Sequence, residues 1–391
     1  MRRHFSFTLL GLALCLGVAW WAAQPREPDP FYQYDARNLP APGTLLRQEP
    51  FKPSTLPPDT TGFRILYTTT RPDGTAAVAS AVVVVPDSAG AHPLIAYAHG
   101  TTGVRPGCAP SNFTDPFPLV PGFSALFQQG WAYVGTDYVG LGTSGTHSYM
   151  VGQDSARATL DSIRAAHAIP GLNIAAETVL WGHSQGGHSA LWAAGLAPHY
   201  APELDIRGVA AVSPATDLPA LARSPNPHLL GKIAAAYFFD SYDRAYPGLD
   251  PWAKVNRPYR WLMKDIAGRC IESPKILFSF AEAALIPAAL LYASPLDQGA
   301  LGERLAENTP RGPFKMPVLI AQGASDTLIP TVMQTAYVHS ICANTAFVTY
   351  HLYPGLDHLS IVDPASPLTA DLIEWTAERM AGTGVAEFPC P

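Results

Sequence analysis

The chain has 391 residues, of which 48% are hydrophobic and 14% are charged, so it can bury a large core and is not a disordered tail. Its formal net charge is −6, from 25 basic and 31 acidic residues, and it contains no basic block. This balance gives no electrostatic basis for binding nucleic acid or an anionic lipid surface.

The N-terminal residues have the pattern of an export signal. Residues 1–4 are basic, residues 5–23 form an uncharged run of 19 residues, and polar residues follow. We therefore expect residues 1–23 to be a signal peptide that sends the chain to the periplasm or out of the cell. The alternative is an uncleaved anchor through residues 5–23, because a run of this length can just span a bilayer.

The cysteines fit an exported protein. Without residues 1–23 the chain keeps an even set of four, Cys108, Cys270, Cys342 and Cys390. In an oxidising compartment this favours disulfides over free thiols, and four cysteines allow three pairings. No pair has C-x-x-C spacing and no histidine–cysteine cluster has metal-ligand spacing, so we expect no metal site.

The next segments change from irregular to strand-like. Residues 24–60 are proline-rich, which suits an extended arm over the surface. Residues 63–70 and 76–85 then flank the turn sequence Pro72-Asp73-Gly74, a pattern that predicts an antiparallel hairpin.

From residue 93 onward, short apolar runs alternate with helical segments. The predicted strands are 93–98, 131–136, 178–181, 208–212, 316–321 and 346–353, and the predicted helices are 155–168, 189–196 and 372–380. Such an alternation predicts an α/β fold whose mostly parallel sheet is covered by helices on both faces. We therefore expect residues 61–391 to form one domain.

One long stretch breaks this alternation. About a hundred residues separate the strand that ends at residue 212 from the strand that begins at 316, and many of them are apolar with helical spacing. A structureless loop of that length is not expected inside a compact domain. Residues 217–310 are therefore predicted to be an inserted helical subdomain.

A nucleophile motif lies between the third of these strands and the following helix. The sequence Gly182-His183-Ser184-Gln185-Gly186 matches G-x-S-x-G, in which the serine occupies a strained turn and exposes its hydroxyl above the sheet. Glycines are needed two residues to either side of the serine because larger side chains would collide with the crossing strand and helix. The motif predicts that Ser184 is a catalytic nucleophile.

A serine hydroxyl needs a base to take its proton and an acid to orient that base. In this kind of fold the acid and then the histidine follow the serine along the chain. Asp326 and His358 come just after two consecutive strands downstream of Ser184, and these are our candidates. Asp357 competes for the role of the acid, but its adjacency to His358 makes the far imidazole nitrogen hard to reach.

The negatively charged intermediate of acyl transfer requires backbone donors. The N–H of Gln185, the residue after the nucleophile, is one candidate. The second is expected from the loop after strand 93–98, at Thr101 or Gly100. Three more histidines near the site are predicted to have packing or supporting roles: His99, His183 and His188.

Several motifs carry a resemblance to a known family. They are residues 42–46 (PGTLL), 98–101 (AHGT), 108–111 (CAPS), 137–142 (DYVGLG), 160–166 (LDSIRAA) and 182–187 (GHSQGG). With these motifs the chain resembles the secretory lipase family of the α/β-hydrolases, which comprises the fungal lipase A type and bacterial relatives. The resemblance extends from about residue 40 to the C-terminus. The His-Gly-Thr form of the loop at residues 99–101 suits the bacterial relatives better than the fungal ones.

The resemblance implies a serine esterase or lipase with Ser184, Asp326 and His358 as its catalytic triad. It also implies that the 217–310 insertion is a lid or cap that houses the acyl-binding site. By the same resemblance, one disulfide joins Cys108 to Cys270 and ties the lid to the core. A second joins Cys342 to Cys390 and holds the C-terminal tail.

Together these observations predict a serine carboxylic ester hydrolase, more specifically a secreted lipase that works through an acyl-enzyme and needs no cofactor. Its substrate would be a small-molecule or lipid ester, in the second case at a lipid–water interface, and a monomer is favoured. The alternatives on the same triad are a short-chain carboxylesterase and an acyltransferase. A non-catalytic binding module would require the loss of a triad residue.

Overall fold

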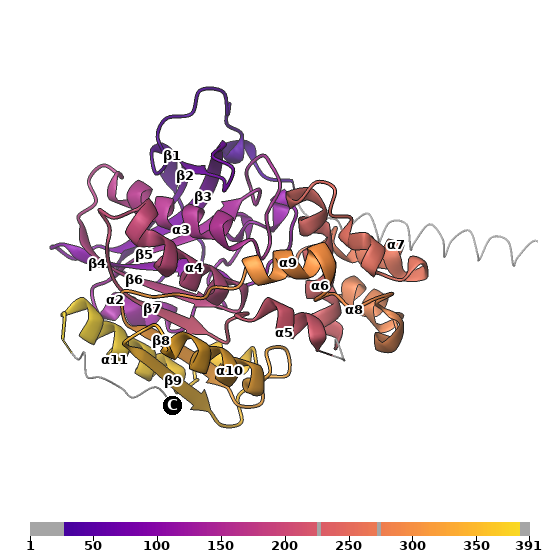
Figure 1. Ribbon diagram of the computed structural model, residues 1–391. Coiled ribbons are helices and arrows are strands. Elements are labelled where there is room, and N and C mark those ends of the chain that lie inside the picture. Colours follow the sequence, from indigo (N-terminus) through magenta and orange to yellow (C-terminus); the bar gives the residue numbers. More distant parts are fainter. Residues whose placement is uncertain (1–26, 225–227, 272–274, 384–391) are drawn as a thin grey trace, which may run out of the picture.

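The computed structural model describes residues 27–224, 228–271 and 275–383 (Figure 1). The predicted signal peptide and Cys390 lie outside the described residues. A twisted central sheet has helices on both faces, and the helices between β7 and β8 gather beside it, at the right of Figure 1.

The described residues form a sheet of nine strands in the order β1-β2-β3-β5-β4-β6-β7-β8-β9. The strands are β1 (Leu45–Pro50), β2 (Thr60–Thr70), β3 (Ala76–Pro86), β4 (His92–Ala98), β5 (Ala132–Val139), β6 (Ile174–His183), β7 (Asp205–Val212), β8 (Val318–Gly323) and β9 (Val348–Tyr353). β4 to β9 run parallel to one another, whereas β1, β2 and β3 pair antiparallel with their neighbours. The predicted mostly parallel α/β-hydrolase sheet and its hairpin are confirmed.

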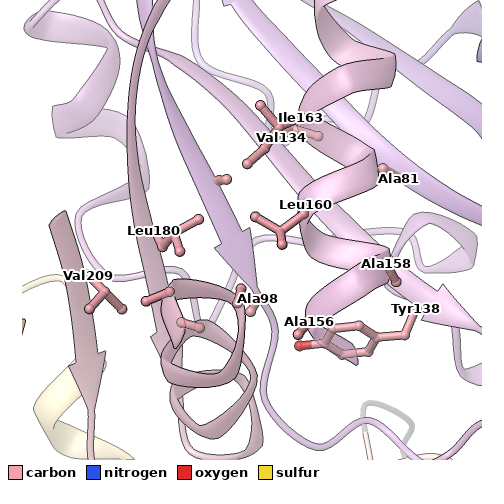
Figure 2. Packing of buried hydrophobic residues seen from close by; sticks show 14 of the residues in the cluster. Ala81, Ala98, Val134, Tyr138, Ala156, Ala158, Leu160, Ile163, Leu180 and Val209 are labelled. Carbon is pink, nitrogen blue, oxygen red and sulfur yellow. The ribbon is translucent and has the colours of Figure 1, made fainter. Parts of the chain in front are cut away.

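Helices cover the two faces of the sheet. α3 (Gly152–His167), α4 (Gln185–Tyr200) and α10 (Thr331–Cys342) pack on one face, and α2 (Phe123–Gln128) and α11 (Leu368–Met380) pack on the other. Strand residues alternate between the two cores: Leu94 and Ala96 face the first, and Ile95 and Tyr97 face the second. In Figure 2, Leu160 of α3 projects toward the strands of the first core.

The segment predicted as an irregular arm contains an edge strand. β1 pairs antiparallel with β2, and its register shifts between Leu45 and Arg47. The arm is also anchored by Arg64 of β2, whose guanidinium donates to the carboxylates of Asp29 and Glu49. This strand was not predicted because edge strands are short and irregular and tolerate proline at their ends.

The stretch predicted as an insertion folds into helices with their own core. These helices are α5 (Leu218–Arg223), α6 (Leu229–Ala245), α7 (Arg260–Ile266), α8 (Ile276–Ala284) and α9 (Gly299–Glu307), and we call them, together with the described segments that join them, the cap. Ile233 and Tyr237 of α6 are fully buried in this core together with Met263 of α7. Lys232 supports the packing, since its ammonium donates to the carbonyls of Ala283 and Ile286 at the end of α8 (3.0 and 2.7 Å).

Candidate active site

Ser184 lies on a sharp turn between β6 and α4. Its backbone has φ 58° and ψ −119°, a strained conformation for a residue with a side chain. The flanking glycines make the turn feasible: a Cβ on Gly182 would lie 2.1 Å from the carbonyl oxygen of Gly186, and one on Gly186 would lie 1.8 Å from that of Ala98. The collision expected from the sequence is therefore with backbone, which cannot move aside.

The three residues predicted as a triad are hydrogen-bonded in series. His358 Nδ1 lies 2.8 Å from Asp326 Oδ2, and His358 Nε2 lies 2.9 Å from Ser184 Oγ. Because the carboxylate can only accept, Nδ1 carries the proton and donates it to Asp326. The neutral imidazole then offers Nε2 as the acceptor for the serine hydroxyl. The arrangement suits a serine activated by a histidine base.

Asp326 is held in a dense set of donors. Its Oδ1 accepts the backbone N–H groups of Leu328 and Ile329 (2.9 and 2.8 Å), and its Oδ2 accepts the side-chain amide of Gln322 (3.0 Å) as well as His358. Burial alone would raise the pKa of Asp326, but the hydrogen bonds from His358 and the two N–H groups outweigh it and lower the pKa. The carboxylate is thus stabilised in its charged form.

Asp357, the competing acid, forms its side-chain hydrogen bonds with the turn after His358, whereas the imidazole Nδ1 bonds to Asp326. Asp357 Oδ1 accepts the backbone N–H groups of Leu359 and Ser360 (3.1 and 2.8 Å), so it shapes the turn that follows His358. Gln322, which donates to Asp326, was not singled out from the sequence. It lies near the end of β8, four residues before Asp326, and that spacing is its local signal.

The three accessory histidines have supporting contacts, as predicted. His183 Nε2 donates to the backbone carbonyl of His358 (2.9 Å), and the two rings lie 4.9 Å apart. Burial lowers the pKa of His183 to about 3, so it is neutral near pH 7. His188 donates to the Asn308 carbonyl (2.7 Å), and His99 Nδ1 lies 2.6 Å from the Gly100 carbonyl oxygen.

The predicted oxyanion residues lie beside Ser184. Gln185 is the first residue of α4, where backbone N–H groups are free of helical partners and the helix dipole favours negative charge. A Cβ on Gly100 would lie 3.8 Å from the Ser184 Cβ, which places the loop after β4 against the serine. Thr101 lines the same cavity as Ser184 and Gln185. Their role as oxyanion donors stays a prediction.

An apolar cavity of about 190 Å³ opens next to the Ser184 hydroxyl. The cap supplies most of its apolar wall, and Thr101, Tyr149 and Gln185 line it on the core side. The cap residues that line it are Leu218, Leu221, Ala222, Gly231, Ala234, Ala235, Phe238, Tyr292, Leu296 and Leu305. A largely apolar pocket with few polar groups suits a hydrocarbon-bearing ligand.

The structure contains the first predicted disulfide, between Cys108 after β4 and Cys270 after α7. Next to it, the backbone N–H of Ile271 donates to the carbonyl of Thr102 (2.8 Å), so the cap is tied to the loop beside Ser184. The second predicted disulfide involves Cys390, which lies outside the described residues.

The described residues provide neither a metal centre nor a membrane-spanning helix. No group of three or more His, Cys, Asp or Glu side chains in this part of the chain could hold a metal ion. Among the same residues, no helix is both long and apolar enough to cross a bilayer.

The sheet order, the strained serine turn and the helical cover on both faces define this chain as an α/β-hydrolase. Residues 122–387 match the profile of the secretory lipase family, and the chain belongs to that family. Both outcomes confirm the resemblance drawn from the sequence motifs.

Individual relatives agree with this assignment. The chain is 29% identical to a secreted triacylglycerol lipase of Malassezia globosa, over 88% of this chain and 80% of the relative. It is also 29% identical to a probable inactive lipase of Mycobacterium tuberculosis, over 95% of this chain and 89% of the relative.

Solved structures show the same fold. The closed state of Candida antarctica lipase A superposes with a TM-score of 0.73 at 20% identity, over 94% of this chain and 90% of the other. The rice cell wall degrading esterase LipA of Xanthomonas oryzae has a TM-score of 0.66 at 20% identity, over 88% and 97%. At this level of identity the similarity establishes the fold alone.

Proposed function

We propose that this protein is an exported serine lipase in which Ser184 is the nucleophile, His358 the general base and acid, and Asp326 the residue that orients His358. The observation that carries the proposal is the hydrogen-bonded series Ser184–His358–Asp326, whose serine lines an apolar cavity. The Mycobacterium relative is named a probable inactive lipase. In this chain all three triad residues are present and in contact, which favours activity.

The reaction follows from the geometry. Ser184 Oγ attacks the ester carbonyl carbon while His358 Nε2 takes the hydroxyl proton, and backbone N–H groups at Gln185 and Thr101 or Gly100 stabilise the oxyanion. The tetrahedral intermediate collapses when His358 gives its proton to the departing alcohol, which leaves an acyl-enzyme. Water then attacks the acyl carbon, His358 takes its proton, and the free acid leaves as the serine is restored.

The cap favours a lipid ester over a small soluble one. Large apolar side chains on α7, α8 and the turn after α8 are exposed: Trp261 (66%), Leu277 (69%), Leu285 (68%) and Leu290 (52%). Exposed apolar side chains that gather on one region mark a surface for contact with an apolar partner. A lipid–water interface is such a partner for a lipase. The Cys108–Cys270 disulfide and the family to which the chain belongs support export.

The test is a rate series with purified protein on esters of increasing acyl length, measured below and above the solubility limit of each ester. We expect the rate to rise when droplets form, and Ser184→Ala to lower kcat by at least about 10³-fold. Ser340→Ala is the matched control, because this exposed serine on α10 bonds only within its own helix (2.7 Å to the Tyr337 carbonyl).

Two outcomes would contradict the proposal in different ways. Full activity in Ser184→Ala would contradict the assignment of Ser184 as the nucleophile. A wild-type protein without activity on any ester would contradict the proposal that the chain is a hydrolase. A wild-type rate that does not rise when droplets form would favour a short-chain esterase on the same triad. Transfer of the acyl group to an added alcohol in preference to water would favour an acyltransferase.

A further inference from the structure

The loop between β5 and α3 contacts the residues on both sides of Ser184. Tyr149 Oη lies 2.8 Å from Thr101 Oγ1, and His147 Nε2 lies 3.2 Å from the side-chain amide nitrogen of Gln185. Tyr149 is only 5% exposed and His147 only 2%. One short loop thus reaches both of the segments that are proposed to supply oxyanion donors.

The direction of the bond to Gln185 can be assigned. His147 Nδ1 faces the Val139 carbonyl (3.3 Å), which can only accept, so Nδ1 carries the proton of the neutral ring. Burial lowers the pKa of His147 to about 3, which keeps the ring neutral near pH 7. Its Nε2 is therefore an acceptor, and the side-chain amide of Gln185 donates to it.

The bond to Thr101 has a direction that matters for catalysis. Burial raises the pKa of Tyr149 to about 12, so the phenol keeps its proton at the pH of the reaction. When Tyr149 donates to Thr101 Oγ1, the threonine hydroxyl keeps its own proton free for a second acceptor. Thr101, Tyr149 and Ser184 line one cavity, and the free proton can point into it.

We propose that Tyr149 and His147 are positioning residues of the oxyanion site, and that Tyr149 orients the Thr101 hydroxyl as an additional donor to the oxyanion. The proposal rests on the proposed serine hydrolase function and assigns residues to that same site. His147 supports the other side by holding the Gln185 side chain, so that the Gln185 backbone N–H keeps its direction.

Helix α6 of the cap is hydrogen-bonded to the backbone of the loop between β5 and α3. Ser241 Oγ on α6 donates to the His147 carbonyl (3.0 Å), and Tyr242 Oη donates to the Met150 carbonyl (3.2 Å). Both of these hydroxyl contacts are buried, where a bond is held in a fixed geometry. The packing of α6 against this loop therefore helps to fix the position of Tyr149.

The test is a double-mutant cycle with Tyr149→Phe and Thr101→Val, with kcat and KM measured on one soluble ester. Thr101→Val is expected to lower kcat about 10²–10³-fold, as the loss of an oxyanion donor does, and Tyr149→Phe about tenfold. KM should change little. In the Thr101→Val background, Tyr149→Phe should cause no further loss of kcat, whereas in Thr101→Ser, which keeps the hydroxyl, it should still lower kcat.

A matched control separates positioning from stability. Tyr337 is another buried tyrosine, on α10, and its hydroxyl donates to the Pro310 carbonyl (2.8 Å). Tyr337→Phe should lower the melting temperature by an amount similar to Tyr149→Phe and leave kcat unchanged. Equal losses of kcat from Tyr149→Phe in the wild-type and Thr101→Val backgrounds would overturn the proposal, and so would an effect on KM alone.

Measuring Ser184→Ala beside these variants distinguishes a failure of the positioning role from a failure of the proposed function. If Ser184→Ala is inactive and Tyr149→Phe keeps the wild-type kcat, the positioning role fails and the serine mechanism stands. If Ser184→Ala keeps the wild-type rate, the proposed function itself fails.

Discussion

At the scale of single residues, the site combines one strained residue with several well-satisfied ones. The strain is located at Ser184, and the backbone around it has no room for side chains at Gly182 or Gly186. Asp326 and His358 are by contrast fully engaged in hydrogen bonds. Backbone strain at the reacting residue and rigid neighbours around it are the expected features of a preorganised site.

Asp326→Asn should lower kcat about 10⁴-fold with a much smaller effect on KM, because an amide at this position favours the wrong tautomer of His358. The fold around the residue should persist, since Gln322, Leu328 and Ile329 still surround it. Steady-state kinetics on a soluble ester provides the measurement.

Asp357→Asn is the matched control, because an asparagine oxygen can still accept the N–H groups of Leu359 and Ser360. Its kcat should stay close to that of the wild type. If Asp357→Asn lost as much activity as Asp326→Asn, the assignment of the acid would be wrong.

The triad candidates could be predicted from the sequence because each follows a recognisable apolar strand, and parallel strands bring their carboxyl ends to one edge of the sheet. Tyr149 could not be predicted in this way. It belongs to a loop without periodicity, and its contact with Thr101 depends on the path of that loop. Residues that act through loops leave no regular spacing in the sequence.

At the scale of helices and strands, the prediction depended on how regular each element is. The buried parallel strands β4 to β8 were located correctly to within a few residues because they are short, continuous and apolar, and β9, at the edge of the sheet, was located to the same accuracy. β1 was missed because it is an irregular edge strand. α10 was missed because polar Gln334 occupies one of its fully buried positions, where its Oε1 faces Thr216 Oγ1 at 3.2 Å.

The Cys108–Cys270 disulfide joins the cap to the segment that follows β4. The Cys108–Cys270 bond spans a sequence separation of 162 residues, and a closed loop of this size reduces the entropy of the unfolded chain. The Cys108→Ser/Cys270→Ser double variant should therefore lose about 2–5 kcal/mol in the free energy of unfolding, measured by urea denaturation.

The same variant should lose activity before it unfolds. The bonded pair lies next to the loop that contains Thr102, and a Cβ on Gly103 would lie 2.6 Å from Cys108 Sγ. Without the disulfide, the loop that contains Thr102 and Gly103 would pack less tightly, and the neighbouring Thr101 would no longer be held close to Ser184. If the variant had the wild-type urea midpoint and the wild-type dependence of kcat on temperature, the disulfide would contribute neither to stability nor to activity.

At the scale of the whole molecule, the buried histidines should make the fold sensitive to acid. Burial lowers the pKa of His99 and His188 to about 4 and that of His147 and His183 to about 3. In the unfolded chain a histidine titrates near 6.5. Below that pH, these histidines are protonated in the unfolded state but stay neutral in the folded state. The free energy of unfolding should fall by roughly 1.4 kcal/mol per pH unit for each such histidine.

The melting temperature should therefore fall steeply between about pH 6.5 and pH 5. Closer to pH 4, three buried carboxyl groups oppose this trend: those of Asp137, Asp154 and Asp161. Burial raises their pKa values, so as the pH falls they are protonated in the folded state before they are protonated in the unfolded state. His188→Gln should reduce this pH dependence of stability by the contribution of one histidine, roughly 1.4 kcal/mol per pH unit. A melting temperature that is flat over this range would contradict the prediction.

The Cys108–Cys270 bond also divides the catalytic residues into two topological groups. Together with the polypeptide between its ends, it closes a covalent ring that contains Ser184, while Asp326 and His358 follow in the tail outside the ring. A protease that cuts one peptide bond inside the ring opens it without releasing a fragment, because the sulfur bridge still joins the two pieces. In an environment rich in proteases, a single cut in the part of the cap that precedes Cys270 would therefore leave the nucleophile covalently attached to the part of the chain that carries its base and acid.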